Sequence, residues 1–584
     1  MKYPLISEIG RFDDSNVTFG GYNHQITCGN GEWYDMKNMS TRYMPILSTR
    51  ARRGIGRSFK NPQGFLDKES LMWIDDCKLY NDGEVVELSG VEIKPGKKNM
   101  IKMGAYVIIF PDKIWYNAKT GECGYMEQKN KYSGNVHVVL TEANGKIITY
   151  HDSEYYDEHT PNDGDYMLSN SGGKASLKIY SGITKSWNAV ATSYFQIQAE
   201  GIGKGLAKDD GVKITIDKSD DWQYASNIFV NDEGYRLSSN FTLVDVADDV
   251  ITVVGLLDDE HTVLVNLDVE RLTPDMAYVT ECNNRLWGCS MDGHEIYASK
   301  LGDARNWNCY MGLSTDSWAA TVGSDGVFTG AITFLGYPLF FKEDRMIKIA
   351  VSSTGAHQLK ESVCRGVQKG SSESLVIIDE LLMYKGTTDV CLYTGSIPVS
   401  ISDSLGEVRY HAAKAGTIDG RYYISMQDEK DDHHLFVYDR GNQTWCREDE
   451  ADIECFIRHN DNLFFLDNAD LTLKDVTGGK DLETAFDWMI ESGMISYDIP
   501  EAKYIGRVAV RMTLAFGTYA RIDIQYDDAD WETKVTIDGK GTRTFTIPIV
   551  PKRCDHFKIR ITGKGDAKIN ALTKRVEKGS DFYV

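Results

Sequence analysis

The chain has little positive charge for its length. Its 584 residues include 64 Lys and Arg against 86 Asp and Glu, which gives a formal net charge of −22 at pH 7. Proteins that wrap nucleic acid need a basic stripe that displaces counterions from the phosphates. No long Lys/Arg run is present here, so sequence-specific nucleic-acid binding is not expected.

Long apolar runs and paired-cysteine motifs are also missing. No stretch approaches the roughly 20 apolar residues that cross a bilayer, and the opening MKYPLISEIGRFDDSN has no long apolar core of a signal peptide. We therefore expect synthesis in the cytoplasm and no membrane insertion. The eleven cysteines are odd in number and form no CxxC motif. They are interpreted as reduced structural thiols, and the sequence predicts no metal or cofactor.

Short strands dominate what is present. Tyr (32), Phe (21), Trp (11) and Gly (53) are abundant, whereas Pro (12) is scarce. The apolar stretches are short and are bounded by Gly, Asp and Asn, and helical periodicity is hard to find. This pattern is typical of β-strands joined by tight turns, so the sequence predicts an all-β protein.

One hairpin pattern recurs seven times. In each unit a short apolar or aromatic strand, a polar turn and a second strand follow one another. Four equivalent positions, Leu339, Leu382, Tyr423 and Phe464, are separated by 43, 41 and 41 residues, the length of a four-stranded propeller blade. We predict a seven-bladed β-propeller, within a range of six to eight blades, with a series of β-sandwiches or a solenoid as alternatives. The units are Leu71–Tyr80, Tyr106–Tyr116, Arg285–Tyr297, Pro338–Ile349, Leu381–Tyr393, Arg421–Tyr438 and Asn462–Lys474.

The spacing of these units divides the chain. Val107 and Trp287 lie 180 residues apart, which predicts an inserted segment of one or two small β domains. After residue 478 longer alternating runs predict a β-sandwich. The predicted divisions are an extended arm (1–50), the first blades (51–130), the inserted β domain or domains (131–275), the remaining blades (276–478) and the C-terminal sandwich (479–584). The arm is expected either to complete a blade or to reach a neighbouring subunit.

Three segments carry a resemblance to a known family. They are GGYNHQITCGNGEWYDMKNMSTRYMPILSTRARRG (20–54), RLWGCSMDGHEIYASKLGDARNW (285–307) and PKRCDHFKIRITGKGDAKINALTKRVEKGSD (551–581). Together they resemble tailed-bacteriophage β-propeller virion proteins, similar in plan to tail hub, stabilisation and nozzle proteins. The resemblance implies a non-enzymatic structural component of the virion tail, assembled as a symmetric homo-oligomeric ring. Its implied partners are other tail, adaptor or portal proteins, and it implies no active-site residues.

One basic cluster stands out against the acidic background. Arg50, Arg52, Arg53 and Arg57 are candidates for docking onto an acidic partner subunit or for contact with DNA near a portal. A solvated linker entering the first blade is the alternative interpretation.

Two other functions remain open. The first is a receptor- or glycan-binding protein at the tail tip, which would use the insert or the C-terminal sandwich as its recognition head. Aromatic residues of the insert such as Trp187, Tyr194, Trp222 and Tyr224 are candidates for contact with glycan or protein, with burial in a core as the alternative interpretation. The second is a propeller enzyme acting on glycans. The segments 290–293 and 324–326 faintly suggest the Asp-box turns of sialidases, but the aromatic residue that should follow is missing, so both are predicted to be hairpin turns. No catalytic residue is predicted.

Overall fold

Nearly all regular structure in the protein is β-sheet. The computed structural model describes residues 10–171, 174–217, 230–231, 236–257, 259–352, 356–479, 481–497 and 502–578. Within these residues the only α-helix is α1 (Ser153–Glu158), and two short 3-10 turns are η2 (Ser372–Ser374) and η3 (Asp403–Leu405). The prediction of an all-β protein is confirmed. No described helix is long and apolar enough to cross a membrane.

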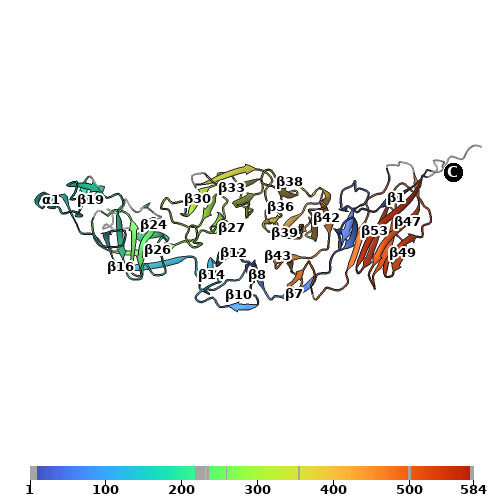
Figure 1. The fold of residues 1–584 in the computed structure, drawn as a ribbon, viewed down its shortest axis with the longest axis horizontal. Coiled ribbons are helices and arrows are strands. Elements are labelled where there is room, and N and C mark those ends of the chain that lie inside the picture. Colours follow the sequence, from blue (N-terminus) through green and yellow to red (C-terminus); the bar gives the residue numbers. More distant parts are fainter. Residues whose placement is uncertain are drawn as a thin grey trace, which may run out of the picture.

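Seven antiparallel sheets occupy the middle of the molecule (Figure 1). Each of the seven predicted hairpins forms the central pair of strands in one of these sheets. The first two sheets contain β8 (Pro62–Asp67), β9 (Leu71–Asp75), β10 (Lys78–Asn81) and β11 (Glu84–Val86), then β12 (Asn99–Met103), β13 (Tyr106–Phe110), β14 (Ile114–Asn117) and β15 (Cys123–Tyr125). The next three contain β27 (Met276–Glu281), β28 (Leu286–Ser290), β29 (Glu295–Ala298) and β30 (Trp318–Thr321); β31 (Gly330–Phe334), β32 (Tyr337–Lys342), β33 (Arg345–Val351) and β34 (His357–Val363); and β35 (Val376–Ile378), β36 (Leu381–Lys385), β37 (Val390–Tyr393) and β38 (Val399–Ser400). The last two contain β39 (His411–Ile418), β40 (Arg421–Gln427), β41 (His433–Asp439) and β42 (Thr444–Arg447), then β43 (Ile453–His459), β44 (Asn462–Asp467), β45 (Thr472–Asp475) and β7 (Gly54–Ser58).

These sheets close into a ring. Their first strands contact one another in the order β8, β12, β27, β31, η2 with β35, β39 and β43, and β43 returns to β8. A buried hydrophobic cluster lies at each of the seven junctions between neighbouring sheets. A four-stranded sheet cannot cover both of its own faces, so neighbours on either side supply the missing contacts. Strand β7 comes from the N-terminal part of the chain and pairs with β45, which joins the two ends of the ring.

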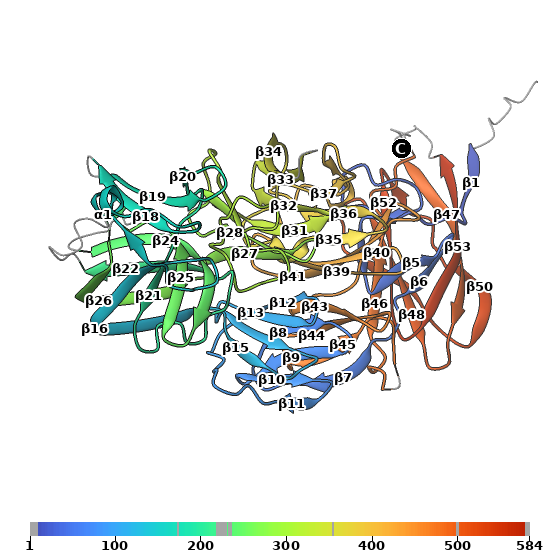
Figure 2. The ribbon, with the colours of Figure 1, turned by 60° about the vertical axis from the view of Figure 1, so that its left-hand side comes forward.

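The insert projects from one side of the ring and forms two sheets (Figure 2). The larger has the order β22-β26-β16-β21-β25-β24-β23, and β22 also pairs with β24, so the sheet closes on itself around aliphatic side chains. The smaller sheet, β17-β18-β19-β20, lies beyond it with α1. The strands of the insert are β16 (Gln128–Thr141), β17 (Tyr150–His151), β18 (Tyr166–Ser171), β19 (Lys174–Ser181), β20 (Ser186–Ala189), β21 (Tyr194–Gln198), β22 (Gly211–Asp217), β23 (Val230–Asn231), β24 (Arg236–Ala247), β25 (Val250–Val254) and β26 (His261–Arg271).

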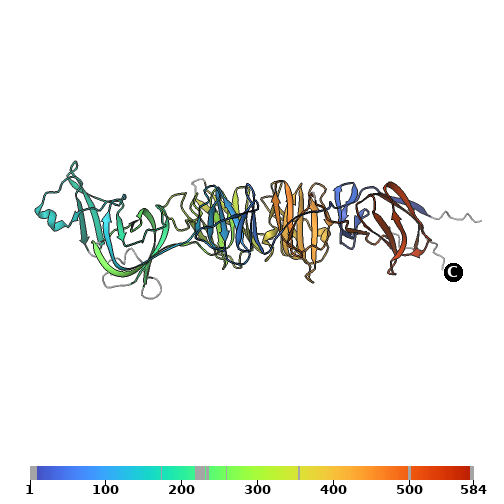
Figure 3. The same cartoon turned by 90° about the horizontal axis from the view of Figure 1, so that it is seen from below.

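The C-terminal part forms two packed sheets at the opposite end of the elongated molecule (Figure 3). They have the orders β5-β6-β53-β47-β50, with β1 and β51 at the side, and β4-β46-β52-β48-β49. Their strands are β46 (Asp487–Glu491), β47 (Lys503–Leu514), β48 (Tyr519–Tyr526), β49 (Glu532–Asp538), β50 (Gly541–Ile547), β51 (Arg553–Cys554), β52 (Phe557–Lys564) and β53 (Ala567–Lys578) together with β1 (Arg11–Asn16), β4 (Asp35–Lys37), β5 (Met39–Tyr43) and β6 (Ile46–Thr49).

The N-terminal segment therefore forms strands of the folded sheets and does not extend away from them as an arm. Strands β1, β4, β5 and β6 belong to the sandwich, and β2 (Gly21–Tyr22), with β3 (Glu32–Trp33) beside it, extends the sheet of β39–β42. The pairing of β2 with β42 adds a strand to a sheet that already has four, so residues 1–50 extend this sheet and do not complete it; the four-stranded sheet of β43–β45 is completed by β7, which follows the predicted arm. Strands β1, β4, β5 and β6 lie in the sandwich sheets instead of forming the predicted extended arm, because the partners of β1, β4 and β6 are strands at the far end of the sequence.

Candidate functional site

The four arginines predicted to contact a partner lie between the ring and the sandwich. Two chain segments connect these parts: residues 50–53, between β6 and β7, and residues 476–486, between β45 and β46. The segments run side by side, because the Ile55 amide donates to the Asp481 carbonyl and the Glu483 amide donates to the Arg53 carbonyl. We call these two segments the paired linkers.

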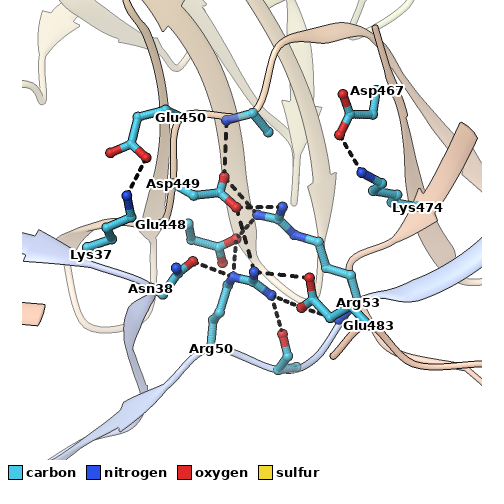
Figure 4. Close-up of polar contacts among 12 residues, drawn as sticks. Lys37, Asn38, Arg50, Arg53, Glu448, Asp449, Glu450, Asp467, Lys474 and Glu483 are labelled. Atoms are coloured by element: carbon cyan, nitrogen blue, oxygen red, sulfur yellow. Dashed lines mark hydrogen bonds and ion pairs between the residues drawn. The ribbon is translucent and has the colours of Figure 1, made fainter. Parts of the chain in front are cut away.

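Arg50 and Arg53 point inward from the first linker (Figure 4). Nη1 of Arg53 lies 2.7 Å from Oδ2 of Asp449, and its Nη2 lies 2.8 Å from Oε2 of Glu448. Arg50 pairs with Glu483 on the second linker and donates from Nε to Oδ1 of Asn38 over 2.7 Å. The side chains of Arg50 and Arg53 are only 4% and 5% exposed. We call this group the arginine clamp: Arg50, Arg53, Glu448, Asp449 and Glu483.

Burial raises the pKa of a carboxyl group, and a neighbouring cation lowers it. At Asp449 burial is the largest single influence and acts upward, but the charge and hydrogen bonds of Arg53, with the charge of Arg50, lower the pKa below its ordinary value. The pKa of Arg53 is raised, because Asp449 and Glu448 outweigh its desolvation. Both partners are thus held in their charged forms.

The other two arginines are more accessible. Arg52 pairs with Asp566 of the sandwich over 3.2 Å and retains 32% of its side-chain exposure. Arg57 is exposed, with its guanidinium 4.7 Å from the centre of the Trp73 ring. The structure therefore removes Arg50 and Arg53 from the candidates for partner docking, because their charges are used within the chain. The prediction stays open for Arg52 and Arg57.

A cavity of about 710 Å³ lies at the centre of the ring. All seven sheets contribute to its lining, mostly through their first strands or the residues just before them. Its charged residues include Lys97 beside β12, Glu373 on η2, Lys414 on β39 and Glu454 on β43. We call these four residues the axial network.

The axial network is a chain of ion pairs across the cavity. Lys97 Nζ lies 2.5 Å from Oε1 of Glu373 and 2.9 Å from Oε1 of Glu454, while Lys414 Nζ lies 3.0 Å from Oε2 of Glu454. Burial acts to raise the pKa of Glu454, but the two lysines lower it overall. Desolvation opposes the charge of Lys97, yet Glu373 and Glu454 raise its pKa to about 12.

This electrostatic arrangement bears on catalysis. A glycosidase usually needs a carboxylic acid that stays protonated near neutral pH, which requires a raised pKa. Glu454 is instead held ionised by two ammonium groups. The cavity thiol of Cys455 has a pKa raised by burial to about 12, so it is protonated and weakly nucleophilic. Lys97, Glu373, Lys414 and Glu454 thus cross-link four of the sheets.

The two segments that suggested Asp-box turns lie in loops of the ring. Ser290 Oγ accepts hydrogen bonds from the amides of His294 and Glu295, closing the turn between β28 and β29. Segment 324–326 lies between β30 and β31, and the Ser324 carbonyl accepts a hydrogen bond from Nζ of buried Lys342 over 2.6 Å. Among the described residues, no group of three or more His, Cys, Asp or Glu is placed to hold a metal ion.

Comparisons with known proteins identify no family. No family model and no curated protein matches the chain. Among solved structures, BamB from Moraxella catarrhalis is 11% identical and matches with a TM-score of 0.30, covering 73% of this chain and 97% of that chain. An exo-β-1,3-galactanase from Phanerochaete chrysosporium is 9% identical with a TM-score of 0.20, covering 50% of this chain and 92% of that chain. Trypanosoma rangeli sialidase is 8% identical with a TM-score of 0.18, covering 90% and 96%. Likenesses this distant carry no argument about function.

The axial network could not be predicted from the sequence. Its residues come from four different sheets and lie up to 357 positions apart, as for Lys97 and Glu454. Each is one ordinary charged residue near a strand, with no motif around it. Only the closed circuit of first strands brings the four together.

Proposed function

We propose that the ring is one seven-bladed β-propeller that acts as a rigid bracket between the insert and the sandwich. In this proposal the protein is a non-enzymatic structural component of a bacteriophage tail, of the hub, nozzle or adaptor type, repeated as a symmetric ring of copies. The observation that carries the proposal is that buried polar contacts fix both end domains to the central sheets.

The insert is fixed at its base. Within the insert, Arg271 at the end of β26 pairs with Asp210 over 2.6 Å, with both side chains at most 4% exposed, and its Nε donates to the Met126 carbonyl just before β16 over 3.2 Å. Asn306, from the loop between β29 and β30, accepts a hydrogen bond from the Gly211 amide and donates to the Asp209 carbonyl over 2.6 Å. Buried polar groups that satisfy one another define a single arrangement, since a slip would leave them unpaired.

The sandwich is fixed to the ring by the arginine clamp and by N-terminal strands of the same chain that lie on both sides of the junction. Strands β4 to β6 precede the ring in sequence but lie in the sandwich, whereas β2 lies on the sheet of β39–β42. The chain therefore crosses this junction several times. Repeated crossings and a buried clamp oppose hinge motion, which suits a rigid part of an assembly.

The charge of the chain agrees with a role beside passing DNA. A net charge of −22 repels phosphates and so limits trapping of nucleic acid. The proposed partners are other tail, adaptor or portal proteins, with Arg52 and Arg57 as basic contacts, and the proposed location is the virion tail.

Immunogold electron microscopy of gradient-purified particles, with antibody against this chain, tests the proposal. Label confined to the tail or the head–tail junction would support it. Particles without label, in a lysate that contains the protein, would contradict it.

A glycan-active enzyme is the second candidate, and one observation favours it: the lining of the central cavity includes three carboxylates, Asp67, Glu373 and Glu454. This candidate predicts turnover on a panel of glycans that disappears when the catalytic pair among them is replaced, with Glu373→Gln and Glu454→Gln as the first variants. The lysine ion pairs of Glu373 and Glu454 argue against it, and absence of turnover on every substrate would remove its support.

A further inference from the structure

The outermost part of the insert carries a cluster of aromatic rings that the bracket role does not use. It lies on α1 and the small sheet β17–β20, at the end of the molecule opposite the sandwich (Figure 1). Of the insert aromatics singled out from the sequence, Trp187 belongs to this cluster, Tyr194 lies on β21, and Trp222 and Tyr224 lie outside the described residues. We call the cluster the aromatic tip; its members are His151, Tyr155, Tyr156, His159, Tyr180 and Trp187.

Three of the rings form a continuous stack. The Tyr155 ring lies 3.8 Å from that of His151 at an interplanar angle of 14°, and 4.1 Å from that of His159 at 3°. Hydrogen bonds at both ends of α1 hold the stack in place. The Asp152 side chain caps α1 by accepting a hydrogen bond from the Tyr155 amide, and the His159 amide donates to the Tyr155 carbonyl. Tyr155 and His159 are nevertheless exposed.

The remaining rings support the stack from one side. Tyr156 meets Tyr155 edge-on at 5.2 Å, Trp187 lies 4.8 Å from Tyr156, and Tyr180 lies 5.2 Å from Trp187. Tyr156 and Trp187 are only half-buried. Their ring contacts hold these side chains in place before any ligand arrives, so a ligand would bind at a small cost in side-chain entropy.

Charge narrows the class of ligand. Residues 150–189 include six acidic residues, Asp152, Glu154, Asp157, Glu158, Asp163 and Asp165, and three basic ones, Lys174, Lys178 and Lys185. The side chains of Glu154, Asp157 and Glu158 on α1 are exposed. Carboxylates accept hydrogen bonds from hydroxyl groups but repel sulfate, phosphate and sugar acids. His151 and His159 cover the two faces of the Tyr155 ring, so the surface open to a ligand is made by the outer rings of the stack and by the half-buried Tyr156 and Trp187. Such ring surfaces, beside acceptors for hydroxyl groups, match an uncharged sugar.

We propose that the aromatic tip binds a neutral glycan, with the sugar rings against the aromatic side chains and the sugar hydroxyls donating to the surrounding carboxylates. This inference goes beyond the bracket role and does not depend on it, because the tip shares no residue with the clamp or the axial network.

The test uses the full chain on a printed array of neutral oligosaccharides (β-1,3-glucan, galactan and mannan) and anionic ones (sialylated and uronic-acid glycans). Tyr155→Ala removes the centre of the stack, and α1 has no buried residues, so the core of the insert stays intact. Tyr155→Phe keeps the ring. Tyr43→Ala, at an exposed aromatic of the sandwich, is the matched control.

The expected result is binding to at least one neutral probe, about tenfold weaker in Tyr155→Ala and Trp187→Ala. Tyr155→Phe and Tyr43→Ala should bind as the parent chain does. Hydrogen exchange with the bound probe should show protection within residues 150–189. If Trp187→Ala disturbs the small sheet, Tyr155→Ala alone decides. Binding to anionic probes only, no binding to any neutral probe, unchanged binding in Tyr155→Ala, or protection confined to another segment would each overturn the proposal.

Discussion

Loss of Arg53 should loosen the junction between the ring and the sandwich. An Arg53→Met variant keeps most of the side-chain volume but leaves Glu448 and Asp449 without their closest cation. Removing one partner of a buried ion pair costs about 3–5 kcal/mol, because the remaining charge is left buried. Arg50 still lies 3.8 Å from Glu448 and 3.6 Å from Asp449, so we expect the lower end, about 3 kcal/mol.

Hydrogen exchange measures this cost locally, which matters because a chain of several domains does not unfold in one step. A loss of about 3 kcal/mol corresponds to roughly hundredfold faster exchange of amides that open with the junction. The informative peptides cover residues 48–56 and 481–487 of the paired linkers. Amides of the insert should be unaffected.

Arg52→Met is the matched control. Arg52 directly precedes Arg53 in the chain. It pairs with Asp566 on the surface, where an ion pair contributes at most about 1 kcal/mol to stability. We expect less than about fivefold faster exchange in this variant. Equal effects of Arg53→Met and Arg52→Met would refute the clamp, because burial would then make no difference.

Three further predictions concern pH and close packing. The pKa of Asp449 is lowered in the folded protein, so its carboxylate stabilises the junction above the ordinary value of 3.8, and this stabilisation is lost as pH falls through the still lower folded value. Junction exchange corrected for intrinsic rates should therefore be constant from pH 7 to 5 and rise below about pH 4. An equal rise in Asp449→Asn would count against this explanation. Burial lowers the pKa of Lys385 from 10.5 to about 8, so the unfolded chain binds this proton more tightly than the folded chain does. The free energy of unfolding of the ring should therefore rise by about 3 kcal/mol between pH 8 and 10.5. The thermal midpoint of the parent should rise relative to that of Lys385→Met over this interval, and parallel curves would show that burying the charged lysine costs nothing. A Cβ atom at Gly211 would lie 2.1 Å from the backbone carbonyl carbon of Asn308, so Gly211→Ala should destabilise the fold by about 1–3 kcal/mol. Hydrogen exchange at the base of the insert should become faster in this variant. Gly164→Ala, at an open turn, is the control and should leave the exchange rate at that base unchanged.

The strand hairpins could be predicted because their signal is local. In Tyr106–Phe110 and Ile114–Asn117, for example, apolar strand residues flank a short polar turn, and the whole unit pairs within a dozen residues. The repeat spacing near 41 residues then indicated how many units belong together. The long separation between Val107 and Trp287 predicted an insert at 131–275, and the structure has two further sheets whose strands run from Gln128 to Arg271.

The N-terminal segment and the arginines could not be placed in this way, since their partners are distant in sequence. In the strand ladders, the backbone of Tyr22 lies opposite that of Trp445, and the backbone of Asp35 lies opposite that of Glu491. Arg53 has basic sequence neighbours and resembles a surface patch, yet its acidic partner Glu448 lies 395 residues away. A local charge pattern does not reveal whether such a cluster is neutralised within the same chain.

The proposal that this chain is a structural component of a phage tail is tested most directly by quantitative mass spectrometry of gradient-purified particles from a lysate that contains the protein. The account predicts the protein at a fixed ratio to the other tail proteins across the particle peak, equal to a small whole number of copies per tail. Protein that stays in the soluble fractions, or whose amount varies independently of the particles, would contradict the account.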